Sequence, residues 1–422
     1  MPEDAAGILI AAAMPSDAGE CAAGPLLMLA VLSANLIADG NLDGEAATAE
    51  AAAPAMLAER IAGHGSLMDA VRRALAGGGS ASEPALQLVS ALQSHNMRRR
   101  PREAVLALLG NGLSLLLDGG GARLGEPSLG NRLLVLARLL LTCGDEQQVA
   151  VAAMVVEHGF IPLLLRALSN HDFNVKSNAM TVLVRVCCCP VGRVAATAHP
   201  AALAAFSNVL RDASALAGVA GGTDAHVLPN LAGNALQAIW CLIADSIAAG
   251  DAFASMALAP SGSGILEAVA LLLAAPEDRH IPSVRAAAAS ALNAITRVAL
   301  HDGRLAALQT RRPLVLGAAE ALVWVAEDLR WDGRSNDGEP PPDYDKGLAL
   351  EAAEALLAAL DCLTDATADD GGGGAAAALG TLCERGPEAL RAFRDAAAYA
   401  AGTIVASRPG ACKDAQPMEE ET

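Results

Sequence analysis

Residues 155–187 read VVEHGFIPLLLRALSNHDFNVKSNAMTVLVRVC, a stretch that predicts the end of one helix, a short second helix and a long third helix. Gly159 suits the position just after the first helix, where a left-handed backbone costs glycine little. Pro162 suits the first turn of the second helix, because its missing N–H would have no partner there. Apolar residues recur at helical spacing along the third helix: Val175, Ala179, Leu183 and Val186.

The third helix of this unit recurs along the chain. Asn131, Asn178 and Asn234 hold the same place near the start of three such helices, at steps of 47 and 56 residues. Val284 then matches Val175 in a further unit. Helical repeats of about 40–47 residues stack because no unit can bury both faces of its helices alone. The recurrence therefore predicts a helical repeat protein.

The stretch GFIPLLLRALSNHDFNVKSNAMTVLVRV resembles an armadillo repeat. It has a glycine-x-isoleucine-proline start, a leucine-rich second helix, a polar turn and a third helix of the form V-K-x-x-A-x-x-x-L. The step lengths suit HEAT repeats as well, and the glycine-x-isoleucine-proline start favours armadillo. The resemblance implies an all-α fold, a right-handed α-α superhelix of roughly seven to eight irregular repeats. We expect an armadillo-like array over 1–407, best-matching units over 129–300, loop insertions at 213–229 and 331–347, and a disordered acidic tail at 408–422.

In armadillo proteins the third helices line a concave groove that holds extended peptides or partner helices, and the resemblance implies the same use here. Exposed positions on the expected third helices are the candidate partner-binding residues: Asn131, Arg138, Asn178, Thr181, Arg185, Asn234, Gln237, Arg285 and Arg297. Leu134, Cys241 and Ser290 are further positions that we expect to be exposed. Arg138 and Arg185 fall at equivalent places and predict a short basic ladder, since arginine holds carboxylates by two parallel hydrogen bonds. The alternative is that all of these are ordinary solvated helix residues.

One departure from the family pattern limits what the resemblance implies. Nuclear-import adaptors of this fold carry a tryptophan and, four residues later, an asparagine on successive third helices. The equivalent positions here hold Thr181 and Arg185 in one helix and Gln237 and Cys241 in the next, and Trp240 is displaced. Recognition of basic import signals is therefore not expected.

The net charge of −18 is unevenly distributed. Residues 131–312 hold thirteen Lys and Arg against twelve Asp and Glu, so the rest of the chain carries −19. This acidity indicates either a surface for basic partners or solvated loops that keep an apolar array soluble. The chain lacks both the basic excess and the stacking aromatics of nucleic-acid sites, with aromatic residues at only 2%. Residues 97–102, MRRRPR, suit either a nuclear-localisation patch or a solvated loop.

Compartment and membrane use follow from the termini and the cysteines. Glu3 and Asp4 stand where a signal peptide would carry basic residues, and nine cysteines without framework spacing suit a reducing compartment. We expect a cytoplasmic protein, with the nucleus left open. The uncharged apolar stretch 24–38 is short for a membrane span of about 20 residues, so we expect a buried helix and no membrane insertion.

Catalytic and metal motifs are not apparent in the sequence. Cys187, Cys188 and Cys189 point in different directions on a helix and lack a C-x-x-C partner, so small buried hydrophobes explain them better than a metal site. His158 and His171 have no nucleophile in a recognisable context. The glycine runs lack the Gly-Lys-Ser/Thr of a phosphate loop. We therefore expect no catalytic residue, no metal and no cofactor.

These observations favour a non-enzymatic scaffold or adaptor that binds other proteins, through an extended peptide or a helix held in the third-helix groove. The alternative is an armadillo-like nucleotide exchange factor or regulator for a chaperone ATPase or a small GTPase. The sequence leaves the identity of the partner and the oligomeric state open.

Overall fold

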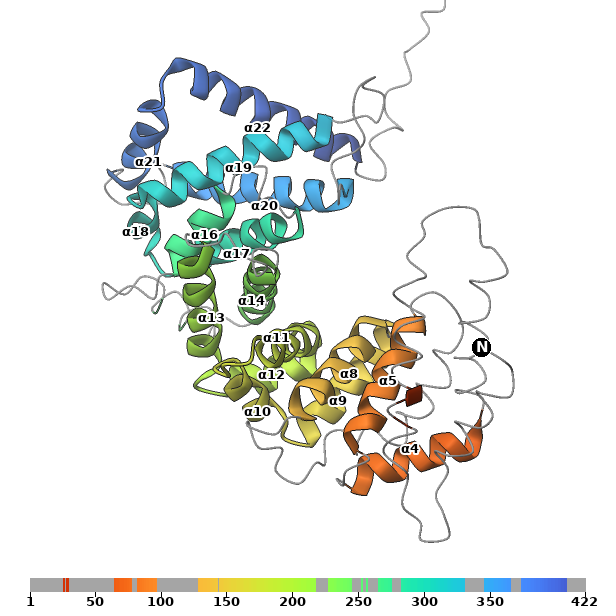
Figure 1. Cartoon of the computed structure of the whole chain (residues 1–422). Coiled ribbons are helices and arrows are strands. Elements are labelled where there is room, and N and C mark those ends of the chain that lie inside the picture. Colours follow the sequence, from red (N-terminus) through yellow and green to blue (C-terminus); the bar gives the residue numbers. More distant parts are fainter. Residues whose placement is uncertain are drawn as a thin grey trace, which may run out of the picture. The chain divides into compact units, whose positions relative to one another are not determined.

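The structure is a computed structural model, and Figure 1 shows its helices. It describes residues 26, 28, 29, 64–77, 82–96, 128–142, 144–217, 227–244, 252, 256, 265–274, 282–330, 345–365 and 373–407. Throughout these residues the regular structure is helical and no strand occurs. The chain divides into two compact units, Met1–His199 and Pro200–Thr422, which we call unit 1 and unit 2.

Unit 1 contains an uninterrupted three-helix repeat formed by α9, α10 and α11. Its helices are α4 (Gly65–Gly77), α5 (Ser82–Asn96), α8 (Ser128–Thr142), α9 (Asp145–Glu157), α10 (Ile161–Ala167), α11 (Phe173–Cys187) and α12 (Pro190–Thr197). The third helices α5, α8 and α11 pack against one another in chain order, while α9 packs against α12. The helices predicted from the opening stretch are therefore confirmed.

Unit 2 repeats the same order of first, second and third helices. Its helices are α13 (Ala202–Ala217), α14 (Val227–Ala244), α16 (Ile265–Leu273), α17 (Pro282–His301), α18 (Leu305–Gln309), α19 (Arg312–Arg330), α20 (Lys346–Thr364), α21 (Gly373–Cys383) and α22 (Pro387–Ser407). Third helices α14, α17 and α20 form one layer, second helices α13, α16, α19 and α22 form another, and first helix α18 packs on α21. The fold is an all-α, armadillo-like solenoid.

Local sequence explains the turns of the central repeat. Gly159 follows α9 with φ 64°, the left-handed conformation that glycine adopts at little cost. Pro162 lies in the first turn of α10, where its missing N–H breaks no helical hydrogen bond. The Asp172 carboxylate caps α11 by accepting a hydrogen bond from the backbone N–H of Asn174 at 2.8 Å. These three residues fix where each helix of the repeat begins or ends.

Glycine near the start of a third helix lets the next third helix approach closely. A Cβ atom added at Gly130 of α8 would lie 3.4 Å from Cγ2 of Val175 on α11. A Cβ atom added at Gly233 of α14 would lie 3.0 Å from Cγ2 of Val284 on α17. Gly130 and Gly233 directly precede the matched residues Asn131 and Asn234, and the two valines match each other in the sequence, so equivalent positions meet in both units.

The expected loop insertions differ from the structure at their ends. Helix α13 continues to Ala217 and α14 begins at Val227, so the insertion predicted at 213–229 is helical at both ends. Helix α20 begins at Lys346, inside the insertion predicted at 331–347. Residues 331–344 of that insertion, the tail 408–422 and the basic segment 97–102 lie outside the described residues.

The α16–α19 contact gives a prediction about packing. A Cβ atom at Gly317 would lie 2.8 Å from the carbonyl oxygen of Ala270, so Gly317→Ala should force the two second helices apart and lower the free energy of unfolding by about 1–3 kcal/mol. The control is Gly402→Ala in α22, where a Cβ atom meets nothing within 4 Å. It should raise the free energy of unfolding by about 0.5–1 kcal/mol, because alanine favours the helix. Urea unfolding measures both, and equal effects would contradict the tight contact.

Candidate partner-binding surface

The third helices of unit 1 present a continuous row of half-buried side chains. Residues spaced by three and four positions share one side of a helix, which places the predicted candidates of α8 together and those of α11 together. We define the unit 1 surface by six half-buried residues on the adjacent helices α8 and α11: Asn131, Leu134, Arg138, Asn178, Thr181 and Arg185. The structure therefore brings five predicted candidates into one surface.

Three of these side chains also join consecutive third helices by hydrogen bonds. Asn178 donates from Nδ2 to the carbonyl oxygen of Gly130 at 3.2 Å, and Asn131 donates from Nδ2 to Glu83 Oε1. Arg138 donates from one guanidinium nitrogen to the carbonyl oxygen of Ser90 at 2.8 Å and to its hydroxyl at 2.6 Å. Each bond spans 48 residues, one repeat. Sequence reasoning missed this second role, because the unequal steps of 47 and 56 residues do not show which atoms of neighbouring helices meet.

Arg138 and Arg185 hold equivalent places but differ in their contacts. Burial lowers the pKa of the Arg138 guanidinium from its ordinary value, and the group still stays a cation at neutral pH. Arg185 is half-buried, and its guanidinium has no hydrogen bond or ion pair with any residue that the structure describes. Its backbone carbonyl accepts hydrogen bonds from Gln148 Nε2 at 3.0 Å and from the Cys189 thiol at 3.6 Å. Thr181 donates its hydroxyl hydrogen within α11, to the carbonyl oxygen of Ser177 at 3.1 Å.

The candidates in unit 2 do not form an equivalent surface. Arg285, predicted to be exposed, is only 3% exposed and lies 4.6 Å from the ring centroid of Trp324 on α19. A cation over an indole face is stabilised by the ring quadrupole, which offsets part of the cost of burial. Ser290 and Cys241 are also buried, at 8% and 2% exposure, so the expectation of exposure was wrong for all three.

The other unit 2 candidates remain accessible to different extents. Asn234 and Gln237 are half-buried on α14, and Arg297 is exposed on α17. Trp240, displaced from the import-type position in the sequence, is 38% exposed on α14. None of these side chains is hydrogen-bonded to a described residue of another helix in the way that Asn178 and Arg138 are.

The cysteine triplet is packed as a small hydrophobic group. Cys187 and Cys189 are buried and Cys188 is half-buried, all as free thiols. Burial, with a smaller contribution from the adjacent Cys188, raises the pKa of the Cys187 thiol to about 12. Across the described part of the chain, no group of three or more His, Cys, Asp or Glu side chains could hold a metal ion.

Helix length and apolarity over the described residues bear on membrane crossing. No single helix there is long and apolar enough to cross a bilayer, and two consecutive pairs, α9 with α10 and α11 with α12, reach that length and apolarity only together, across bends of 89° and 114°.

No family model matches the chain, and no curated protein matches it. The structure is similar to two engineered proteins solved by a structural genomics consortium, each 16% identical, with TM-scores of 0.46 and 0.43. The first match covers 70% of this chain and 97% of the engineered chain. The second covers 95% of this chain and 94% of the engineered chain. It is also similar to a designed armadillo repeat protein at 14% identity and a TM-score of 0.40, over 62% of this chain and 98% of that chain.

The two equivalent arginines give a stability prediction. Arg138→Met removes two hydrogen bonds to Ser90, and we expect it to lower the free energy of unfolding by about 1–3 kcal/mol. Arg185→Met removes no hydrogen bond to a described residue, and we expect a change within about 0.5 kcal/mol. Chemical denaturation of both variants checks this. A larger loss for Arg185→Met would show that its guanidinium serves the fold.

The cysteines give a prediction about reactivity. Because the thiolate is the reactive form, the raised pKa of Cys187 keeps it almost entirely protonated at about pH 8, and burial also blocks reagents. Cys383, exposed on α21, should be alkylated by iodoacetamide in the native protein, whereas Cys187 should react only after unfolding. Peptide mass spectrometry after a short alkylation pulse measures both. Native labelling of Cys187 at the rate of Cys383 would contradict the burial of the triplet.

Proposed function

We propose that this protein is a non-enzymatic protein–protein interaction scaffold, which binds an extended peptide or a partner helix on the unit 1 surface. The armadillo-like repeat fold is the general support for a protein-interaction role. The single observation that carries the finer proposal is Arg185, a half-buried cation with no polar partner among the described residues.

A carboxylate of the partner is the group that suits Arg185. An ion pair with a carboxylate is stronger for a guanidinium that is partly removed from water than for a fully exposed one. The planar N–H donors of the guanidinium also match the two carboxylate oxygens. Arg138, on the neighbouring third helix, supplies a second positive charge while Ser90 holds it in place. The carboxylate of Glu83 accepts from Asn131 at the start of α8, so that end of the surface already holds an acidic side chain. The partner's acidic residue is therefore expected near the end of α8 and α11.

The two asparagines suit the backbone of an extended peptide. Each amide has two N–H donors and one carbonyl acceptor, and Asn131 and Asn178 each direct a single described hydrogen bond towards the preceding third helix. The remaining N–H and oxygen of each amide match the alternating C=O and N–H groups of an extended chain. Because the inward bond orients each amide, little side-chain entropy remains to be lost on binding.

The experiment is quantitative affinity purification with the full-length tagged chain and with Arg185→Ala. Arg166→Ala is the matched control, because Arg166 is an exposed arginine on α10 outside the unit 1 surface. Direct partners should lose affinity by about tenfold or more in Arg185→Ala and should be retained by Arg166→Ala. Changing the acidic residues of a captured peptide to amides should weaken binding to the wild type but not to Arg185→Ala.

Two results would overturn this proposal. One is a set of partners whose affinities are the same for the wild type and for Arg185→Ala. The other is a peptide whose acidic residues matter equally for both proteins, because the carboxylate would then be bound elsewhere. The double variant Arg138→Ala/Arg185→Ala is a further comparison, and its stability must be measured alongside, since Arg138 also holds Ser90.

A further inference from the structure

A small groove opens in the second-helix layer of unit 2. Its volume is about 200 Å³, and it lies between α19 and α22, next to the end of α21. Large apolar side chains form most of its walls: Leu316, Val323, Trp324, Leu382, Leu390 and Phe393. Of the described residues that line it, Glu320 and Arg385 are the charged ones.

The groove exists because α22 is buried only over its second half. Ala396, Ala400 and Ile404 are the buried residues of this helix, and all lie beyond the groove. Over residues 387–395 no side chain is buried, and Leu390 and Phe393 are left half-buried. The first half of α22 therefore stands away from α19 and leaves apolar surface in contact with water.

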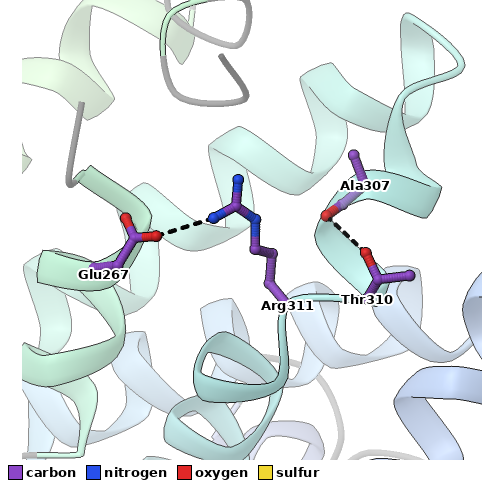
Figure 2. A network of polar contacts seen from close by, with 4 residues as sticks. All are labelled: Glu267, Ala307, Thr310 and Arg311. Atoms are coloured by element: carbon purple, nitrogen blue, oxygen red, sulfur yellow. Dashed lines mark hydrogen bonds and ion pairs between the residues drawn. The ribbon is translucent and has the colours of Figure 1, made fainter. Parts of the chain in front are cut away.

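The preceding pair of second helices shows the same contact closed. Arg311, just before α19, forms an ion pair with Glu267 of α16 at 2.9 Å, as Figure 2 shows. Arg385, just before α22, forms the corresponding ion pair with Glu320 of α19. Between α16 and α19, however, Gly317 brings the helices as close as a glycine permits. The groove is thus the open form of an interface that is tightly packed one repeat earlier.

Trp324 is a fixed wall of this groove. Its indole is held by Arg285, which is almost fully buried and lies 4.6 Å from the ring centroid. A wall that is already immobilised loses little conformational entropy when a ligand binds. Apolar walls with a charged rim are also the arrangement found around anchor residues at protein interfaces.

We propose that the groove binds one large apolar side chain, of the leucine or phenylalanine type, presented by a partner protein. The two lining charges neutralise each other, so the complementary occupant is uncharged. The volume is below the roughly 300–1,000 Å³ of typical small-molecule sites, which favours a single anchor side chain. This site is separate from the unit 1 surface and does not depend on it.

The test selects a phage-displayed library of random dodecapeptides against the full-length chain. The groove-filling variant is Ala392→Phe, because Ala392 lines the groove and is exposed, so the larger ring should not disturb the core. Ala398→Phe, at an exposed position of α22 outside the groove, is the matched control. Fluorotryptophan labelling with fluorine NMR reports directly on Trp324, assigned by Trp324→Phe.

We expect the selected peptides to share a leucine or a phenylalanine and to shift the Trp324 resonance. Their affinity should fall by about tenfold or more for Ala392→Phe. It should be unchanged for Ala398→Phe and for Arg185→Ala. The proposal is overturned if no peptide is enriched, or if enriched peptides bind Ala392→Phe as tightly as the wild type. It is equally overturned if N-acetyl-leucinamide or N-acetyl-phenylalaninamide binds as tightly as the peptides, because the groove would then be a small-molecule site.

Discussion

Close approach of successive third helices is the constraint on which the rest of this fold depends. Gly130 faces Val175 in unit 1, and Gly233 faces Val284 in unit 2, with no room to spare at the second contact. A single repeat exposes apolar surface on both sides, so its stability comes from its neighbours. The glycines at the start of α8 and α14 therefore let the next third helix approach and bury that surface.

Because the third helices lie close together, side chains that we propose for partner binding also contact the neighbouring third helix. Residues 48 positions apart come within hydrogen-bond distance, and Asn178 and Arg138 use this to bond to Gly130 and Ser90. A residue predicted to meet a partner then also stabilises the solenoid. Arg185 differs from its equivalent, because none of its described neighbours accepts from its guanidinium. Of the two equivalent arginines, Arg138 is therefore bonded to the neighbouring third helix, and Arg185 is the one that we propose as a binding position.

Sequence periodicity correctly predicted helices and turns, which depend on residues nearby in the chain. It failed to predict burial that depends on a residue from another repeat. Gly159, Pro162 and the apolar spacing of α11 were enough to predict a three-helix unit. Arg285 was misplaced because its burial depends on Trp324, which belongs to the next repeat's second helix. Helix ends near the insertions also differed from the prediction, since α13 continues to Ala217 and α20 begins at Lys346.

No sequence pattern predicted the α19–α22 groove, because the groove depends on the direction in which α22 runs relative to α19. The ion pair Arg385–Glu320 repeats the pair Arg311–Glu267, so the same kind of contact joins α19 to α16 and α22 to α19. A closed interface needs, in addition, a small residue such as Gly317 where the helices cross. Helix α22 is instead anchored over its second half by alanines and Ile404, which is sufficient to order it without closing its first half. Apolar surface left open in this way costs about 25 cal/mol per Å² relative to burial, so an occupant of the groove recovers free energy that the fold itself does not use.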